Sequence, residues 1–354
     1  MHSLPLRVRV CASLLIMLSR DLGVDLGTSN LRVFQRGRGV VAREATVVAY
    51  AKGTKTPRAF GAEASRLIGR SPDTLEIVRP VRQGAISSFA ATQALLSQCL
   101  SGVGIGRVLG RPRMVVCVPS GVTSVERQAM LDACRSAGAR EVVSVESPMA
   151  AALGLGLPIS EPQGHLIVDV GGGTSDIAVT SLGGIVVSDS ARVGGDDFDE
   201  AIYRAIKRRH SIVIAERTAE EVKIAIGSAF PLAEELETEV RGRDMTDGMP
   251  KIVRVSSVEV RAAIHDQVGQ IIARVRSVLE RTPPELVNDI AQSGLWLVGG
   301  SALLRGLDER LKDETGLIVH RSDDPESSVI NGLGLALEHI GALSETHLPL
   351  AQAR

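Results

Sequence analysis

Two stretches of the chain share one pattern of apolar and polar positions. Residues 22–34 read LGVDLGTSNLRVF, and residues 167–179 read IVDVGGGTSDIAV. In each stretch an apolar strand ends in aspartate, glycine and threonine form a turn, and a second strand with alternating apolar positions completes a β-hairpin. After the second copy, a turn at Gly183 and Gly184 leads into a strand at 185–193, which makes a meander. Because one element occurs twice, the pattern predicts a duplicated domain.

The pattern between the two copies alternates between strands and helices. The predicted elements are a buried strand at 114–119, a helix at 124–137 that Gly138 closes, and a strand at 141–146. Ser147 as N-cap and Pro148 at the first helical position then start a helix of small residues. Hairpins interleaved with strand–helix alternation predict an α/β fold with mixed sheets.

The second half continues with longer helices. Its predicted elements are a helix at 197–209, a helix through Ala229 with Thr218 and Glu221 as capping box, short strands at 236–256, and a long helix at 257–281 that stops before Pro283 and Pro284. The last ones are a strand at 295–298, a helix from about Ser301, a strand at 317–320 and a helix that ends near Ile340. Residues after Leu343 are expected to be disordered.

Composition limits the possible functions. A chain of 354 residues with 44% hydrophobic content is long enough for two domains with sizeable cores. The 40 lysine and arginine residues nearly balance the 41 aspartate and glutamate residues, and aromatic side chains are few, so no nucleic-acid partner is expected. The four cysteines form no CxxC pair and no cysteine–histidine cluster. They indicate neither a disulfide framework nor a zinc site, which fits a cytoplasmic protein.

The N-terminal extension, residues 1–20, permits three interpretations. Arg7 and Arg9 precede an apolar stretch at 10–18, as in a secretory signal, but the stretch is short and no small-residue cleavage site follows. Alternatively, one face of a short amphipathic helix would lie on a membrane, formed by Cys11, Leu14, Leu15 and Leu18. The third interpretation is a disordered extension, or one not translated at all, because Met17 is also a plausible start. No apolar run reaches the roughly 18 residues that a spanning helix needs.

The two glycine turns carry candidate phosphate and metal ligands. Glycine lets backbone N–H groups approach phosphate oxygens, hydroxyls add donors, and a strand-end aspartate holds Mg²⁺ directly or through water. The first group is Asp25, Gly27, Thr28, Ser29 and Asn30; the second is Asp169, Gly171, Gly172, Gly173 and Thr174. One such hairpin alone is equally compatible with an ordinary tight turn. Two related copies favour a clamp on nucleotide phosphates, with Asp25 and Asp169 as metal ligands.

Several longer stretches resemble the MreB and Mbl family of bacterial actins. They are VCVPSGVTSVERQAMLDACRSAGAREV, PMAAALGLGLP, RVGGDDFDEAI, ERTAEEVKIAIGSA, ERTPPEL and GGSALLRGLDERLKDETGL, together with the two turns. The resemblance runs from about Asp21 to Ile340. It implies an actin-like ATPase fold of the duplicated ribonuclease H-like type with four subdomains, ATP and Mg²⁺ in the cleft, and filaments of the chain itself. It also implies association with the inner membrane surface and the cell-wall synthesis machinery, in control of cell shape through peptidoglycan synthesis.

The same resemblance divides the chain into two domains. The expected divisions are a first domain at 21–155 with a small subdomain inserted at about 46–82, a second domain at 156–343 with an insertion at about 197–254, and a tail at 344–354.

Positions that match the family extend the candidate site. Those expected beside the nucleoside are Glu220, Glu221, Val222 and Lys223, and those expected on its other side are Gly299, Gly300, Ser301 and Ala302. From the residues alone, Glu220 and Lys223 are equally compatible with an exposed ion pair on one helix face. The glycines at the strand-to-helix junction are equally compatible with a tight turn and a helix cap.

The catalytic position departs from the family pattern. The family has two glutamates before the helix PMAAA, whereas this chain has Glu146 followed by Ser147. Serine cannot act as a carboxylate base, and neighbouring strand residues point to opposite faces, so Glu146 is not a simple replacement. With Thr174 these are the catalytic candidates, and ATP hydrolysis is expected to be weak. Ala45 and Leu31 are smaller departures, where the family usually has proline and threonine.

Membrane contact is expected at the loop before the strand at 114–119. There, two apolar residues lie beside three arginines: Val108 and Leu109 with Arg107, Arg111 and Arg113. Apolar insertion would combine with attraction to anionic headgroups of about 1 kcal/mol per charge. A loop with incidental arginines is the alternative.

Two other classes of protein share the predicted fold. A small-molecule kinase needs an aspartate base beside a substrate hydroxyl, and the sequence shows no additional motif for one. A chaperone ATPase needs a peptide-binding domain, for which the chain leaves no room after the actin-like region.

Overall fold

The computed structural model describes residues 21–70, 73–104 and 111–339. Within these ranges no helix is both long and apolar enough to cross a membrane. The expectations for residues 1–20, for Arg107, Val108 and Leu109, and for the tail at 344–354 concern residues outside this description.

Five strands form the sheet of the first domain, in the order β10-β9-β1-β2-β3. They are β1 (Leu22–Leu26), β2 (Asn30–Gln35), β3 (Gly39–Ala45), β9 (Arg113–Val118) and β10 (Glu141–Glu146). Strand β1 is antiparallel to β2 and parallel to β9, so the sheet is mixed, as predicted. Helices α3 (Phe89–Gly102) and α4 (Ser124–Ala137) cover one face, where Leu22, Val24 and Met114 are fully buried.

The sheet of the second domain repeats this arrangement. Its strands are β11 (His165–Val170), β12 (Ser175–Ser181), β13 (Gly184–Ala191), β17 (Leu295–Val298) and β18 (Val319–Arg321), in the order β13-β12-β11-β17-β18. Asp25 pairs with Arg32 across the first hairpin, and Asp169 pairs with Asp176 across the second. The two hairpins therefore align at a constant offset of 144 residues (169 minus 25, and 176 minus 32). The predicted duplication is confirmed.

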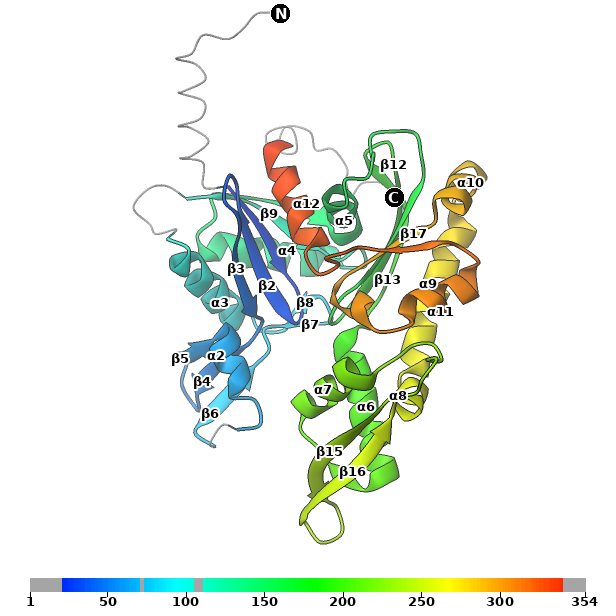
Figure 1. Ribbon diagram of the computed structural model, residues 1–354. Coiled ribbons are helices and arrows are strands. Elements are labelled where there is room, and N and C mark those ends of the chain that lie inside the picture. Colours follow the sequence, from blue (N-terminus) through cyan, green and yellow to red (C-terminus); the bar gives the residue numbers. More distant parts are fainter. Residues whose placement is uncertain (1–20, 71–72, 105–110, 340–354) are drawn as a thin grey trace, which may run out of the picture.

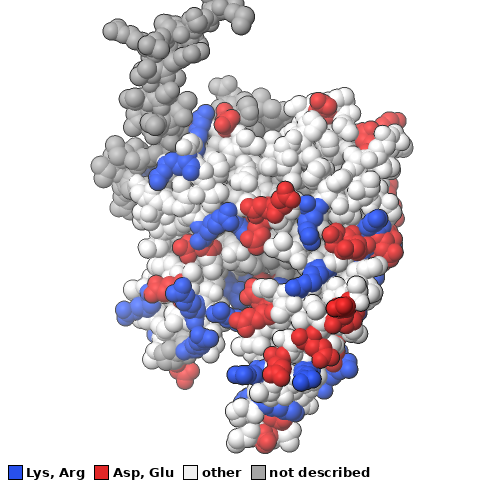
Figure 2. All heavy atoms as spheres, in the orientation of Figure 1, with Lys and Arg blue, Asp and Glu red and all other residues white. Residues whose placement is uncertain are grey.

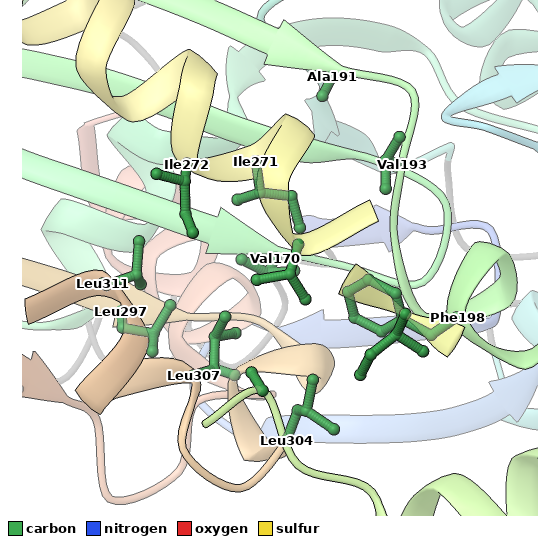
Figure 3. Close-up of a cluster of buried hydrophobic side chains, with 14 of the residues drawn as sticks. Val170, Ala191, Val193, Phe198, Ile271, Ile272, Leu297, Leu304, Leu307 and Leu311 are labelled. Carbon is green, nitrogen blue, oxygen red and sulfur yellow. The ribbon is translucent and has the colours of Figure 1, made fainter. Parts of the chain in front are cut away.

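A large apolar core supports the second hairpin. It combines the sheet with helices α6 (Gly195–His210), α9 (His265–Arg281) and α11 (Leu307–Thr315). Figure 3 shows Val170, at the end of β11, among side chains of this core that include Phe198, Ile271 and Leu307. Because Phe198 is fully buried, the helix that follows the second turn is anchored directly beside it.

Two helices, α5 (Ser147–Gly154) and α12 (Ser328–Ala336), lie side by side between the sheets (Figure 1). Their buried residues form one cluster with Val115 of the first sheet and Ile167 of the second. The helix backbones touch, because a Cβ on Gly154 would come within 1.9 Å of the Ser328 carbonyl oxygen and one on Gly332 within 1.7 Å of that of Ala150. This close packing couples the two domains.

Each domain carries a small additional sheet at the lower end in Figure 1. The first consists of β4 (Val48–Ala51), β5 (Pro57–Phe60) and β6 (Leu75–Val78) with α2 (Gly61–Arg66); the second consists of β14 (Ile212–Val213), β15 (Glu237–Asp244) and β16 (Pro250–Ser256) with α7 (Glu216–Ile226) and α8 (Ser257–Ala263). The short pair β7 (Val81–Arg82) and β8 (Ala85–Ile86) connects the first of these sheets to α3. Figure 2 shows a notch between the two lower lobes, with charged side chains of both signs around it.

Several helix boundaries differ from the predictions. Helix α7 begins at Glu216 after Ala215 and ends at Ile226, so the Thr218 capping box and the extension through Ala229 are wrong. The amide of Thr218 already bonds to the Ala215 carbonyl oxygen at 3.0 Å, which places Thr218 inside the first turn.

The predicted long helix at 257–281 is interrupted. Helices α8 and α9 meet at Ile264, whose φ of −93° and ψ of 3° leave the helical range while its side chain is fully buried. A further helix, α10 (Pro284–Ser293), begins at the second proline, where only a stop was predicted. Proline is favourable in a first helical turn, so Pro284 starts α10 soon after α9 ends at Arg281.

The segment after β17 also differs. A 3₁₀ turn, η2 (Gly300–Leu303), precedes α11, so the long helix begins later than Ser301. The last strand is shorter and shifted, at Val319–Arg321, and α12 continues into the 3₁₀ turn η3 (Leu337–His339).

Candidate functional site

A cavity of about 470 Å³ lies between the two domains. Most candidate residues line it: Asp25, Gly27, Thr28, Ser29, Asn30, Ser147, Asp169, Gly171, Gly172, Gly173, Thr174, Glu220, Lys223, Gly299, Gly300 and Ser301. Four do not: Glu146, Glu221, Val222 and Ala302. The volume is within the range of small-molecule sites.

The two turns have the same backbone geometry. In the first, the Gly27 amide donates to the Asn30 carbonyl oxygen at 2.9 Å; in the second, the Gly171 amide donates to that of Thr174 at 2.8 Å. Both turns therefore direct a short loop of backbone toward the cavity from opposite domains.

The turns also approach one another closely. A Cβ on Gly172 would come within 2.0 Å of the Ser29 hydroxyl oxygen, and one on Gly173 within 2.5 Å of the Thr28 hydroxyl oxygen. Ser29 in turn donates to a carboxylate oxygen of Asp196, in the first turn of α6, at 3.3 Å. A side chain at Gly172 or Gly173 would have to displace Ser29 or Thr28, so glycine permits the close approach of the two turns.

The strand-end aspartates have different surroundings. Asp25 lies 3.4 Å from the Arg32 guanidinium, which opposes the rise that burial causes in the pKa of Asp25. Asp169 is 8% exposed and has no hydrogen-bond or ion-pair partner among the described residues. Burial, the facing Asp176 and Asp25 raise the pKa of Asp169 to about 8. Burial likewise raises the pKa of Asp176 to about 6.

These surroundings fit a divalent cation. An ion beside Asp169 would stabilise its ionised form, which burial and like charge otherwise disfavour. The described residues contain no group of three or more acidic, histidine or cysteine side chains placed to hold a metal. Mg²⁺ is commonly held by one or two carboxylates together with substrate phosphates and water, so Asp25 and Asp169 suffice.

The opposite end of the cavity is formed by α7 and the segment after β17. Lys223 donates to Asp199 at 2.9 Å and to the Gly195 carbonyl oxygen at 3.0 Å, so its ion pair is with Asp199 and not with Glu220. Burial raises the pKa of Asp199 to about 6, although Lys223 opposes the rise. Glu220 remains directed to the cavity.

Three neighbouring candidates serve the structure. Val222 and Ala302 are buried in the core of the second domain, and Glu221 forms an exposed ion pair with Arg217 at 3.0 Å. Helical geometry turns these three side chains away from the cavity.

The segment of Gly299, Gly300 and Ser301 approaches the second hairpin closely. Gly299 has a φ of 89°, and a Cβ there would lie 2.4 Å from an Asp169 carboxylate oxygen. The Ser301 hydroxyl donates to the Gly171 carbonyl oxygen at 2.8 Å. The junction therefore both fixes the second turn and lines the cavity.

Ser147 and Glu146 occupy different environments. Ser147 lines the cavity; its hydroxyl lies 2.9 Å from the Cys117 sulfur and donates to the Val118 carbonyl oxygen at 3.3 Å. Glu146 lies 3.5 Å from Arg127, and burial raises the pKa of Glu146. Glu146 is also the N-cap of α5, and Ser147 is the first helical residue, so the predicted capping role of Ser147 is wrong.

Sequence patterns missed other lining residues. They include Arg32, Cys117, Asp176, Asp196, Ile224, Leu303, Arg305 and Glu326. Arg32 and Asp176 occupy equivalent positions of the two hairpins, each opposite a strand-end aspartate. The repeated sequence therefore contains the signal that identifies both residues.

Two related mixed sheets around a cavity lined by a glycine turn from each domain define an actin-like protein. The family model described as MreB/Mbl protein matches residues 19–345, and the chain belongs to the MreB/Mbl family.

Relatives and solved structures agree with this assignment. The chain is 41% identical over 332 residues to the cell shape-determining protein Mbl of Bacillus subtilis, covering 94% of this chain and 100% of that protein. It is 44% identical over 329 residues to the cell shape-determining protein MreB of Escherichia coli K12, covering 92% and 95%. The structure is similar to that of MreB5 of Spiroplasma citri bound to ADP, with a TM-score of 0.87, 36% identity, and coverage of 92% and 98%. It is also similar to the MamK double helical filament, with a TM-score of 0.77, 25% identity, and coverage of 90% and 98%.

Proposed function

We propose that this chain binds ATP with Mg²⁺ in the cavity between its domains, assembles into filaments, and contributes to the control of cell shape. The observation that carries the proposal is the convergence of two equivalent glycine turns on one cavity from opposite domains. A nucleotide held by both turns would fix the angle between the domains, which is how nucleotide state is expected to affect assembly.

The residues have distinct tasks in this proposal. Backbone N–H groups of the turns and the hydroxyls of Thr28, Ser29 and Thr174 would bind phosphate oxygens. Asp25 and Asp169 would hold Mg²⁺, whose charge would be shared with the phosphates. At the other end, Glu220 and the apolar side chains of Ile224 and Leu303 would face the nucleoside; the latter two are 64% and 55% exposed.

Known relatives support both parts of the proposal. MreB5 of Spiroplasma citri has been solved with ADP and with AMPPNP, and each structure has a TM-score of 0.87 to this chain. MamK has been solved as a double helical filament. We extend the proposal to the cytoplasmic face of the inner membrane and to the organisation of peptidoglycan synthesis, on the basis of family membership.

Weak hydrolysis is part of the proposal. Ser147 lines the cavity at the position where the family has glutamate, and its hydroxyl contacts Cys117 and a backbone carbonyl. Asp176 also lines the cavity but accepts the Ser120 amide at 2.9 Å. The first domain thus presents no free carboxylate base at Ser147.

Nucleotide binding followed by sedimentation tests the proposal. With Mg²⁺ present, the purified protein is expected to bind a fluorescent ATP analogue and then to pellet as filaments visible by electron microscopy. A panel of sugars and small acids serves as a parallel assay, because a kinase of the same fold would phosphorylate one of them. Phosphorylation without pelleting would replace the proposed function by that of a kinase.

A further inference from the structure

Arg32 is a charged residue of the cavity that lies outside the two turns. It belongs to β2, directly across from Asp25, and its side chain is 12% exposed. Its Nη1 lies 3.4 Å from Asp25 Oδ2, and its Nη2 lies 3.3 Å from Oε2 of Glu326. Glu326 precedes α12 and lies 294 positions after Arg32 along the chain, so the guanidinium links the first hairpin to the segment before α12.

These two contacts leave much of the hydrogen-bonding capacity of the guanidinium unused. Arginine carries five N–H donors, and strong charge-assisted bonds to carboxylates measure about 2.7 to 2.9 Å. Both Arg32 contacts are longer, and within the described ranges Asp25 and Glu326 are the hydrogen-bond partners of its side chain. Donors therefore remain for an anion in the cavity.

The other described cations that line the cavity lie at its opposite end, in α7 and in the segment after β17. Lys223 donates to Asp199 and to a backbone carbonyl, and Arg305 donates to the Ile224 carbonyl oxygen at 2.9 Å. Arg32, in contrast, also acts electrostatically on Asp169, so its charge reaches both strand-end aspartates. It is the lining cation that lies where the phosphates and the metal would meet.

We propose that Arg32 binds the nucleotide phosphates and supplies part of the positive charge that Mg²⁺ would otherwise provide. ATP then binds with little dependence on a divalent cation, and the cation itself binds more weakly than it would without Arg32. This proposal rests on the ATP binding proposed above. The positive charge of Arg32 attracts the phosphates and repels a metal cation at Asp25. Its removal is therefore expected to weaken ATP binding and to strengthen cation binding.

The charge-removing variant Arg32→Gln tests both effects. For wild-type protein, replacing Mg²⁺ by EDTA is expected to weaken binding of the fluorescent ATP analogue by at most about tenfold, whereas for Arg32→Gln the loss is about a hundredfold. Binding of Mn²⁺ to nucleotide-free protein, followed by electron paramagnetic resonance, is expected to tighten about tenfold in Arg32→Gln. The matched control Glu326→Gln removes the charge of the second ion-pair partner but keeps the guanidinium, and its EDTA penalty is expected to equal that of the wild type.

Each outcome decides a different point. An equal EDTA penalty in wild type and Arg32→Gln, or equal changes in Arg32→Gln and Glu326→Gln, would reduce Arg32 to a structural bridge. If Arg32→Gln does not fold, the wild type alone decides, because an EDTA penalty above about tenfold contradicts the proposal. Wild-type protein that binds no ATP under either condition would instead overturn the proposed function.

Discussion

The two hairpins have the same backbone but opposite electrostatics. Both end a buried strand in aspartate and continue through a four-residue turn with nearly identical hydrogen bonds. In the first hairpin the residue opposite Asp25 is Arg32; in the second the residue opposite Asp169 is Asp176. Like charges directly across a strand pair destabilise it, and opposite charges stabilise it. In the proposed function the duplicated backbone would provide two phosphate-binding turns, and the charges would favour the metal chiefly in the second domain.

The difference extends to the first residue of each hairpin. Asp21 and His165 are equivalent at the offset of 144 residues. Arg113 donates to both carboxylate oxygens of Asp21, at 3.1 and 2.6 Å. His165 is 4% exposed, and its Nε2 has no hydrogen-bond partner in the described part of the chain. The first hairpin thus has an ion pair at each end. At the corresponding ends of the second hairpin, His165 and Asp169 have no ion-pair partner among the described residues.

The largest expected effect separates the two aspartates. Asp169→Asn is expected to lower the affinity of the ATP-bound protein for Mg²⁺ at least about a hundredfold, because Asp169 forms no ion pair within the described residues and feels Arg32 only at longer range. Asp25→Asn is expected to cost only about tenfold, because Arg32 already neutralises part of that charge. Titration of a fluorescent ATP analogue with Mg²⁺ measures both variants, with circular dichroism as the control for folding.

Equal losses in the two variants would show that the hairpins contribute alike despite their charges. Unchanged affinity in a folded Asp169→Asn variant would remove Asp169 from the metal site altogether.

Sequence alone identifies the part of the molecule that is encoded locally. The two hairpins, the mixed α/β fold and the buried strand at β9 follow from alternation of apolar residues and from glycine at turns, which act over a few positions. The Asp25 and Asp169 turns are recognisable for the same reason.

The missed features depend on contacts between distant residues. Glu326 reaches the cavity only because α12 returns to the first sheet, and the break at Ile264 occurs within an apolar pattern that continues across it. Lys223 pairs with Asp199 of a different helix, although Glu220 is three positions away. Local spacing does not encode which of several partners a side chain will meet.

A smaller effect is expected when a carboxylate is added to the first domain. Ser147→Glu is expected to raise the rate of phosphate release about tenfold, because it places a base on the cavity side that lacks one. This rate increase is smaller than the roughly 10²- to 10⁴-fold acceleration that a well-placed general base provides. Ser147 is only 7% exposed, so a longer side chain must displace its neighbours. Phosphate release under polymerising conditions measures the rate.

The matched control is Ser147→Gln, which has the same size without the charge and is expected to stay at the wild-type rate. Glu146 is the competing residue. Brisk hydrolysis by the wild type that collapses in Glu146→Gln would show that Glu146 acts as the base in spite of its contact with Arg127.

The smallest expected effect concerns His165, where the second hairpin lacks the ion pair of the first. Burial lowers the pKa of His165, although the Pro158 backbone and the charges of Asp289 and Glu161 oppose this. A base whose pKa is lower in the folded state binds fewer protons there, so the free energy of unfolding falls as pH decreases below the unfolded value of about 6.5. Relative to His165→Gln, the wild type is expected to lose about 1 kcal/mol of unfolding free energy between pH 7 and pH 5, measured by thermal unfolding. An equal pH slope in wild type and His165→Gln would show that His165 does not contribute to the acid sensitivity and that the two hairpin ends tolerate protonation alike.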